Sequence, residues 1–297
     1  MADTHPPICD YEGSKYSSEF WTAERAYEDQ AEVIALQQLL PQSGNLLLEL
    51  GAGSGRNSPR YTGYRQVVLL DYSLSQLQQA QQNLGRNQRF LYVAADIYQL
   101  PFVVGLFDAA TMIRTLHHMT DPLAALKQVR GALQTGATFV LEYANKQNLK
   151  SILRYRFHKQ SWSPYDLESV EFEKLNFDFH PQMIAKWLKE ANFELQRQLA
   201  VSYLRLGVIK RIVPLSLLAR VERWLQPTGK FYQLSPSIFT RNQAIGDNPK
   251  AQVDTFFKCP ACEAYDLQPY GPRIICTGCS REYPIRNGIF DFRLQAE

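Results

Sequence analysis

Four cysteines near the end of the chain are spaced as metal ligands. The two pairs, in the runs CPAC and CTGC, are Cys259 with Cys262 and Cys276 with Cys279. Each Cys-x-x-Cys turn offers two thiolates on one side, and two such turns complete the tetrahedral four-thiolate site that structural Zn²⁺ prefers. A closed site of this kind leaves no position for a reactive water. The spacing therefore predicts a structural zinc ion, with an iron–sulfur or redox role as the alternative.

A second group of residues could bind a nucleotide-like ligand. The apolar run at 46–50 leads into a turn that contains Gly51, Gly53 and Gly55. Glycines tolerate positive φ and let backbone N–H groups approach a ligand closely. A dinucleotide fingerprint needs Gly or Ala at position 56, which is Arg here, so NAD and a redox enzyme of that type are disfavoured.

Acidic residues follow the next two apolar runs. Asp71 comes directly after the run at 67–70, about 20 residues beyond the first glycine, where a carboxylate can accept hydrogen bonds from ribose hydroxyls. Asp96 follows the run at 90–95. Both acids could instead be N-caps of the following segments. If the runs are parallel strands, their carboxyl ends meet at one crevice of the sheet, where such sheets bind ligands.

These residues carry a resemblance to a known family. The pattern Glu49-x-Gly51-x-Gly53-x-Gly55 resembles motif I of class I S-adenosylmethionine-dependent methyltransferases of the type 11 kind, and residues 107–133 resemble that family's fourth strand and following helix. In the family, the acid at Asp96 meets the adenine amino group and the next residue, Ile97, lies against the ring. The resemblance implies S-adenosyl-L-methionine as cofactor and S-adenosyl-L-homocysteine as product. The implied cofactor-binding residues are Glu49, Gly51, Ala52, Gly53, Gly55, Asp71, Tyr72, Asp96, Ile97 and Arg114.

The same resemblance indicates where a methyl acceptor would lie. Methyl transfer from a sulfonium is a direct displacement, so a base is needed only for acceptors that must lose a proton. His117 and His118 are the candidate catalytic residues, with loop packing as the alternative role. Arg114, Glu142, Tyr143 and His180 are further candidates on the substrate side. The helix expected at 18–40 could cover the cofactor through Tyr16, Phe20, Trp21 and Arg25.

The residues around the last cysteines, CTGCSREYPIRNGIFDF, resemble a small zinc-ribbon family whose members bind and activate several RNA and protein methyltransferases. Asn287 replaces the usual Asp, and Phe290 stands where Pro is common. The resemblance suggests an activator or stabiliser supplied within the same chain, at high effective concentration. A nucleic-acid-binding ribbon is the alternative, which the excess of acidic over basic residues in 251–297 does not favour.

The elements that must position these residues alternate along the chain. Short apolar runs separated by helix-like segments, clearest at 74–84 and 122–133, predict an α/β fold with a parallel sheet covered on both faces. With the resemblance, we expect a Rossmann-like seven-stranded class I methyltransferase sheet and a small C-terminal β zinc ribbon. The predicted division is an N-terminal helical cap at 1–44, the methyltransferase domain at 45–240 with a substrate cap at about 146–228, a linker at 241–252, and the ribbon at 253–297.

Composition limits the remaining possibilities. The net charge of +3 is too small to demand a nucleic acid or an anionic membrane as partner, although basic residues gather at 146–159 and 205–230. No transmembrane segment and no leader pattern is seen, so a cytoplasmic protein is expected. The preferred substrate is a small molecule or lipid-like compound. The alternatives are an RNA or tRNA methyltransferase and a non-catalytic cofactor-binding module. The sequence leaves open whether the protein has a protein partner. Cys9, outside the two pairs, is expected to be an ordinary thiol with no special role.

Overall fold

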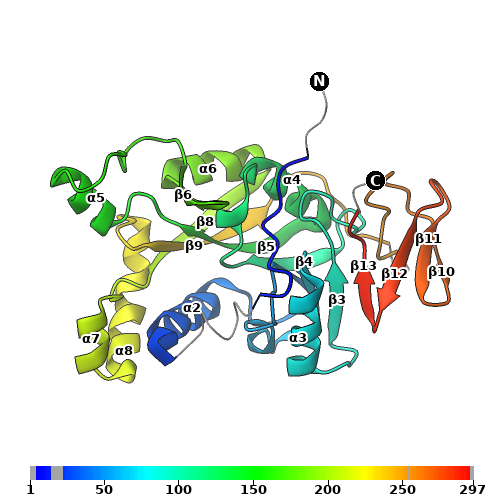
Figure 1. Cartoon of the computed structure of the whole chain (residues 1–297), viewed down its shortest axis with the longest axis horizontal. Coiled ribbons are helices and arrows are strands. Elements are labelled where there is room, and N and C mark those ends of the chain that lie inside the picture. The colour runs from blue at the N-terminus through cyan, green and yellow to red at the C-terminus, as the bar shows by residue number, and fades with distance from the viewer. Residues whose placement is uncertain (1–4, 15–22, 253–254, 295–297) are drawn as a thin grey trace.

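The computed structural model of the chain describes residues 5–14, 23–252 and 255–294. Its centre is one continuous mixed sheet with helices on both faces (Figure 1). Seven strands form the larger part of this sheet, in the order β3 (Phe90–Ala94), β2 (Tyr64–Asp71), β1 (Gly44–Leu50), β4 (Phe107–Met112), β5 (Leu133–Ala144), β9 (Ser237–Ala244) and β8 (Phe193–Val201). Within this part, β9 is antiparallel to both of its neighbours and the other pairs are parallel.

The central strands form where the sequence is continuously apolar. Leu47, Leu48, Val67, Val68 and Leu69 are completely buried, as expected for parallel strands covered on both sides. Buried side chains of the strands and the covering helices form two hydrophobic clusters, one on each face of the sheet. The sequence therefore predicted the positions of the five parallel strands β1 to β5 correctly.

Helices cover the two faces. α2 (Ala26–Leu39) and α3 (Leu74–Leu84) pack on one face, while α4 (Pro122–Ala132) and α6 (Pro181–Glu190) pack on the other. The Asp121 side chain accepts a hydrogen bond from the backbone N–H of Ala124 at 3.0 Å and caps α4, as the sequence predicts. The remaining elements are α5 (Leu149–Arg156), β6 (Val170–Glu173), β7 (Asn176–Asp178), α7 (Gly207–Ile212), α8 (Leu215–Leu225) and the 3₁₀ turns η1 (Ala23–Arg25), η2 (Ser58–Arg60), η3 (Leu116–His118) and η4 (Gln226–Lys230).

The expectation of a seven-stranded sheet was wrong, because the C-terminal ribbon adds its own strands to the same sheet. These are β10 (Leu267–Tyr270), β11 (Arg273–Cys276), β12 (Glu282–Arg286) and β13 (Ile289–Asp291), and the whole sheet has 11 strands. β13 lies parallel to β3, with Ile289 opposite Tyr92 and Asp291 opposite Ala94. β3 would otherwise be an open edge strand with unpaired backbone groups, which the ribbon satisfies.

Aromatic side chains hold the ribbon against the larger part. Phe257 stacks on Phe102 with ring centroids 5.9 Å apart and lies 4.8 Å from Phe292. The segment before the ribbon differs from the predicted linker, because β9 continues to Ala244 and residues beyond it are bonded to the surface. For example, the N–H of Ala251 donates to the carbonyl oxygen of Gly105 at 2.9 Å. The ribbon therefore packs on its own chain.

None of the helices in the described parts of the chain is long and apolar enough to cross a membrane.

Candidate functional site

The glycine turn after β1 has the conformation that the sequence predicts. Gly51, Gly53 and Gly55 all have positive φ, at 66°, 53° and 78°. A Cβ at Gly51 would lie 2.1 Å from Oγ1 of Thr115, whereas a Cβ at Gly53 would meet little more than open space. Gly51 is thus required by backbone conformation and by packing, and Gly53 leaves its surroundings free for a ligand.

Asp71 and Asp96 lie beside this turn because β2 and β3 end there. Asp71 accepts hydrogen bonds from the backbone N–H groups of Gly53, at 2.8 Å, and Ser73, at 2.9 Å. Burial raises the pKa of Asp71 to about 6, although these two donors work in the opposite direction. Burial also raises the pKa of Asp96. A partly buried and a buried carboxylate on adjacent strand ends are suited to accept hydrogen bonds from a polar ligand.

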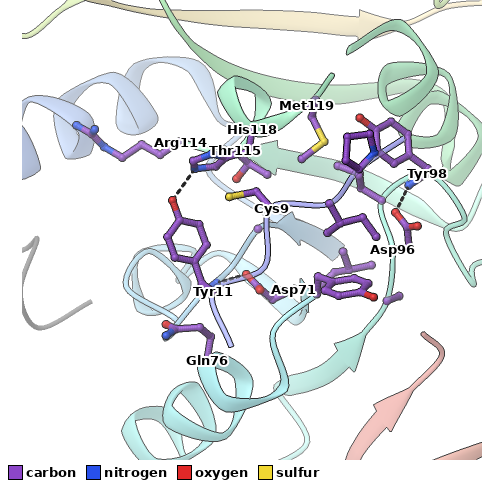
Figure 2. Close-up of a pocket in the computed structure, with 18 residues that line it drawn as sticks. Cys9, Tyr11, Asp71, Gln76, Asp96, Tyr98, Arg114, Thr115, His118 and Met119 are labelled. Atoms are coloured by element: carbon purple, nitrogen blue, oxygen red, sulfur yellow. Dashed lines mark hydrogen bonds between the residues drawn. The ribbon is translucent and has the colours of Figure 1, made fainter. Parts of the chain in front are cut away.

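One pocket joins these residues, and Figure 2 shows its lining. Eight of the residues expected to bind the cofactor or the substrate line it, namely Gly51, Gly53, Asp71, Tyr72, Asp96, Ile97, Arg114 and His118. A smaller neighbouring pocket shares Gly51, Gly53 and Arg114 with it and adds Glu49 and Ala52. Together the two pockets surround the glycine turn. Gly55 lies apart from both linings, and its position leaves no room for a side chain next to Leu84 of α3.

Residues 5–14 cross this pocket, which the sequence did not reveal. His5 contacts Asp96, with Nε2 and Oδ2 2.7 Å apart, and Cys9 lines the pocket. The hydroxyl of Tyr11 lies 3.1 Å from Nε2 of His118. The carboxylate of Glu12 accepts a hydrogen bond from the Ser73 hydroxyl at 3.1 Å. We call residues 5–14 the N-terminal strap.

The lid that the sequence suggested stays a prediction for most of its residues. Tyr16, Phe20 and Trp21 lie outside the described residues, and Arg25 ends the 3₁₀ turn η1 away from the pocket lining. Cys9, expected to have no special role, lies in the pocket, and burial raises its pKa. No motif marks the strap in the sequence, because its polar residues gain partners only when the chain folds back over β2 and β3.

Glu49, near the end of β1, binds two hydroxyl groups next to the glycine turn. Its carboxylate accepts hydrogen bonds from the hydroxyls of Ser58, at 2.5 Å, and Tyr61, at 3.4 Å. Burial raises the pKa of Glu49 to about 7, against the opposing hydrogen bond from Ser58. These contacts favour a mainly structural role, although the side chain borders the smaller pocket.

Arg114 connects the pocket to two buried acids. Its Nε donates to Glu32 at 2.6 Å, and its backbone N–H donates to Glu142 at 2.8 Å. Glu142 also accepts a hydrogen bond from the hydroxyl of Ser237 at 2.6 Å. Arg114 has a φ of 55°, an uncommon value for a side-chain-bearing residue that is often found at functional sites. Glu142 thus positions the backbone of Arg114.

The two histidines differ in their surroundings. Both ring nitrogens of His118 are engaged, Nε2 with Tyr11 and Nδ1 with the carbonyl oxygen of Leu175 at 2.9 Å. The ring of His117 lies 4.0 Å from that of His118. Burial, followed by the nearby charges of His118 and Arg114, holds the pKa of His117 well below its usual range. The same causes disfavour the protonated ring and make His117 a weak base, and it does not line the pocket around Asp71. Both nitrogens of His118 already have partners in the strap and the loop.

The other predicted substrate-side residues are structural in their contacts. Tyr143 is completely buried, and its hydroxyl has no hydrogen-bond partner among the described residues. His180 caps α6 by accepting a hydrogen bond from the N–H of Gln182 at 3.2 Å. Neither residue lines the pocket around Asp71.

Two charged residues near Glu142 were missed from the sequence. Burial and the charge of Glu142 raise the pKa of Asp178 to about 6, although Arg205 opposes this. Arg205 lines a second cavity, between α2 and α7, and its Nε is buried with no hydrogen-bond partner in the described parts of the chain. They lie on segments far from the glycine turn in sequence, so only the folded chain brings Asp178 near Glu142 and Arg205 near Arg114.

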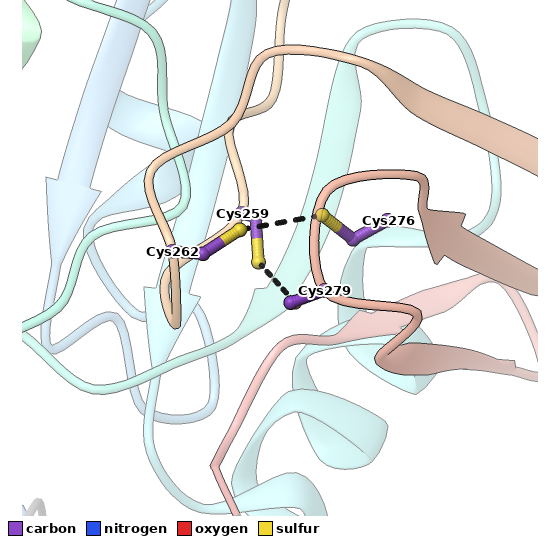
Figure 3. A group of neighbouring side chains, drawn as sticks. All are labelled: Cys259, Cys262, Cys276 and Cys279. Atoms are coloured by element: carbon purple, nitrogen blue, oxygen red, sulfur yellow. Dashed lines mark hydrogen bonds between the residues drawn. The ribbon is translucent and has the colours of Figure 1, made fainter.

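The four ribbon cysteines form one cluster, shown in Figure 3. Their sulfur atoms lie within 4.8 Å of one another and none is in a disulfide. A tetrahedral zinc ion with Zn–S bonds of about 2.3 Å would hold its sulfurs about 3.8 Å apart, close to the 3.7 Å between Cys259 and Cys279. The donor set therefore fits zinc.

The two cysteine turns have the same backbone geometry. The N–H of Glu263 donates to the carbonyl oxygen of Cys259, and the N–H of Ser280 donates to that of Cys276, both at 2.8 Å. Glu263 and Ser280 both have φ near 60°. The hydroxyl of Tyr283 lies 3.0 Å from Sγ of Cys259 and can donate to a thiolate there. Two cysteine turns of the same geometry and a hydroxyl that can donate to one of the sulfur atoms are features typical of structural zinc sites.

Comparisons with known proteins agree with this geometry. Residues 48–141 match the type 11 family described as a methyltransferase domain. An uncharacterized chloroplastic methyltransferase of Arabidopsis thaliana is 31% identical over 116 residues, which cover 36% of this chain and 33% of that protein. A demethylmenaquinone methyltransferase of Clavibacter sepedonicus is 25% identical over 172 residues, covering 54% of this chain and 70% of that enzyme. The chain thus spans only about a third of the first relative.

Among solved structures, a chain from the complex between a methyltransferase activator of Haloferax volcanii and its candidate methyltransferase superimposes with a TM-score of 0.54. The match covers 78% of this chain and 96% of that chain at 16% sequence identity. At this identity, the comparison shows the fold alone. The larger part of the sheet therefore has the Rossmann-like methyltransferase fold.

Proposed function

We propose that the protein is an S-adenosylmethionine-dependent methyltransferase that acts on a small or lipid-like acceptor. The observation that carries this proposal is the convergence of Gly51, Gly53, Asp71 and Asp96 on one pocket at the carboxyl ends of β1, β2 and β3. When bound, the cofactor supplies a methyl group on a sulfonium. The match of residues 48–141 to a methyltransferase domain supports the same reaction.

Four residues of the pocket have specific roles in this proposal. Asp71 accepts hydrogen bonds from the ribose hydroxyls, and Asp96 accepts one from the adenine amino group. Ile97, which is mostly buried and lines the pocket, lies against the adenine ring. Gly53 leaves the space that the ligand occupies. Since Asp96 contacts His5 in the structure, the beginning of the strap gives up this contact when adenine binds.

The acceptor lies near Arg114 and His117. Direct displacement needs mainly positioning and the exclusion of water. For an acceptor that must lose a proton, His117 is the candidate base, with a basicity that its burial and the charge of Arg114 reduce, while His118 holds Tyr11 of the strap in place. Glu142 is a positioning residue that acts through the backbone of Arg114.

The ribbon supports the cofactor pocket within the same chain. β13 pairs with β3, and the N–H of Phe292 donates to the carbonyl oxygen of Ala94 at 2.8 Å, two residues before Asp96. A structural zinc ion held by Cys259, Cys262, Cys276 and Cys279 keeps the ribbon folded. In this proposal the ribbon stabilises the pocket from within the same chain, and a separate activator protein is not needed for that purpose.

An RNA acceptor is the second candidate. The segment around α5 exposes Lys150, Arg154 and Arg156 together with Phe157, a combination that can contact phosphates and bases. Lys146 does not contribute, because its ammonium group is bonded to the carbonyl oxygens of Asp166 and Glu168, at 2.9 and 2.6 Å. The basic surface is therefore smaller than the sequence suggests.

The experiment that tests the proposal is transfer of a labelled methyl group from S-adenosylmethionine to a cell extract separated into lipid, small-molecule, RNA and protein fractions. The control is Asp71→Ala, which removes the ribose-binding carboxylate. We expect label in the lipid or small-molecule fraction that is lost in the variant. Label in RNA would establish the second candidate, and cofactor binding with no transfer to any fraction would show a non-catalytic module.

A further inference from the structure

α7 and α8 form a helical hairpin at the end of the molecule opposite the ribbon (Figure 1). Large apolar side chains of this hairpin are exposed, with Trp224 80% and Ile212 76% accessible. Apart from Leu215, which lines a cavity beside α2, the exposed apolar residues are Leu206, Val208, Ile212, Leu217, Val221 and Trp224. We call this group the hairpin surface. Large apolar side chains exposed together on two neighbouring helices of a folded protein point to an interaction site.

The helical spacing places these side chains on one side of each helix. Leu217, Val221 and Trp224 follow the i, i+4, i+7 pattern of an apolar stripe along α8. The other side of α8 carries Leu218 and Glu222, which are buried against the rest of the protein. The packing of α8 therefore leaves the apolar stripe of Leu217, Val221 and Trp224 outside the hydrophobic core.

The exposed charges of the hairpin itself are of one sign, although the exposed Glu24 of η1 lines the cavity beside it. Arg211, Arg220 and Arg223 are exposed, whereas Glu222 is the only acid between residues 205 and 230 and is fully buried. Its carboxylate accepts hydrogen bonds from the hydroxyl of Tyr27, at 2.5 Å, and from the N–H of Ser202, at 2.6 Å. The hairpin thus presents apolar side chains and cations to its surroundings, with no exposed acid of its own.

We propose that the hairpin surface docks on a lipid bilayer that contains anionic phospholipids. Amphipathic helices with this pattern lie in the plane of the interface, where apolar side chains enter the acyl boundary and arginines remain among the headgroups. Charge complementarity favours this occupant over a second copy of the chain. A two-fold contact through the same surface would bring the cationic patches of two copies together, with no exposed acid on either hairpin to pair with them.

The docking would place a cavity at the membrane. Arg211 and Leu215 of the hairpin line this cavity together with Tyr27 and Arg205, whose Nε is the buried donor without a partner among the described residues. If the proposed methyl transfer is correct, a lipid-like acceptor could enter from this side. The docking itself does not depend on that activity.

Flotation of the purified full chain with vesicles tests the proposal, using phosphatidylcholine alone and phosphatidylcholine mixed with phosphatidylglycerol. We expect binding to the mixed vesicles and much weaker binding to the neutral ones. The double variant Ile212→Asp/Trp224→Asp should lose binding. The variant Arg211→Gln/Arg220→Gln should bind the mixed vesicles roughly 25-fold more weakly, at about fivefold for each arginine.

The matched control is Phe172→Asp/Tyr270→Asp, which places the same charges on exposed aromatic positions of β6 and the ribbon, 62% and 63% accessible. It should float like the wild type, and unchanged melting temperatures would show that all variants are folded. The proposal is overturned if the wild type does not float with mixed vesicles, or if the control loses binding as completely as the hairpin variant. A concentration-dependent dimer that Ile212→Asp/Trp224→Asp dissociates, without vesicle binding, would identify a second copy as the occupant.

Discussion

The guanidinium of Arg293, on the ribbon, lies over the ring of Tyr72, 5.7 Å from its centroid, and donates a hydrogen bond to the Tyr72 carbonyl oxygen at 3.3 Å. Tyr72 follows Asp71 directly and lines the same pocket. Arg293 is itself held by the carboxylate of Asp291, with Nη2 and Oδ2 2.8 Å apart. The last residues of the ribbon therefore contact the segment that carries the proposed ribose-binding carboxylate.

Replacing Arg293 should weaken cofactor binding. The Arg293→Ala substitution removes the cation–π contact and the hydrogen bond to Tyr72, so the loop after Asp71 gains freedom. A partly buried cation–π contact is worth about 1 kcal/mol, which corresponds to roughly fivefold weaker binding of S-adenosylhomocysteine by calorimetry. Arg273→Ala, which affects an exposed ion pair with Glu282 inside the ribbon, should leave the affinity unchanged. Equal affinities for wild type and Arg293→Ala would show that the ribbon does not brace the pocket.

The ribbon should hold one zinc ion for each chain. Metal analysis of the purified protein tests this, and Cys262→Ser should lower the zinc content while Cys9→Ser leaves it unchanged. Because β13 depends on the folded ribbon to stay paired with β3, chelation should lower the melting temperature and also the affinity for S-adenosylhomocysteine. Iron in place of zinc, together with the visible absorption of an iron–sulfur cluster, would contradict the prediction.

Cofactor affinity should fall in acid. Asp71 must be ionised to accept hydrogen bonds from ribose hydroxyls, and burial raises its pKa to about 6. The dissociation constant of S-adenosylhomocysteine should be nearly constant between about pH 7 and 8 and should rise up to about tenfold for each unit below pH 6. The side chain in Asp71→Asn cannot ionise, so this variant should bind S-adenosylhomocysteine weakly. Its dissociation constant should keep only the pH dependence that Asp96 contributes. A flat profile in the wild type down to about pH 5 would mean that the carboxylate is not needed.

Alanine at position 51 should damage the site more than alanine at another glycine. A Cβ at Gly51 would lie 2.1 Å from Oγ1 of Thr115, and the φ of 66° is unfavourable for alanine. We expect Gly51→Ala to lower the free energy of unfolding by at least about 2 kcal/mol and to abolish cofactor binding. A Cβ added at Gly131, in α4, would meet no described atom within 4 Å, so Gly131→Ala should stabilise the helix by up to about 1 kcal/mol. Thermal unfolding of both variants checks the contrast.

The sequence alone predicted the parts of the protein that local patterns encode. The apolar runs of β1 to β5 and the cap at Asp121 are visible in it because burial on both faces and capping depend on residue type and spacing. The glycine turn with Asp71, and the cysteine cluster, were predicted for the same reason. In each case the residues that act together are neighbours in sequence or lie at the ends of successive strands.

Only the tertiary structure decided how distant segments meet. The strap over the pocket, the pairing of β13 with β3, the contact of Arg293 with Tyr72 and the exposed side of α8 depend on contacts between residues far apart in the chain. A strand pattern shows that an edge will need a partner but not which strand supplies it, because backbone hydrogen bonds are the same for every sequence. The amphipathic pattern of α8 likewise shows two faces, and only packing determines which one the core buries.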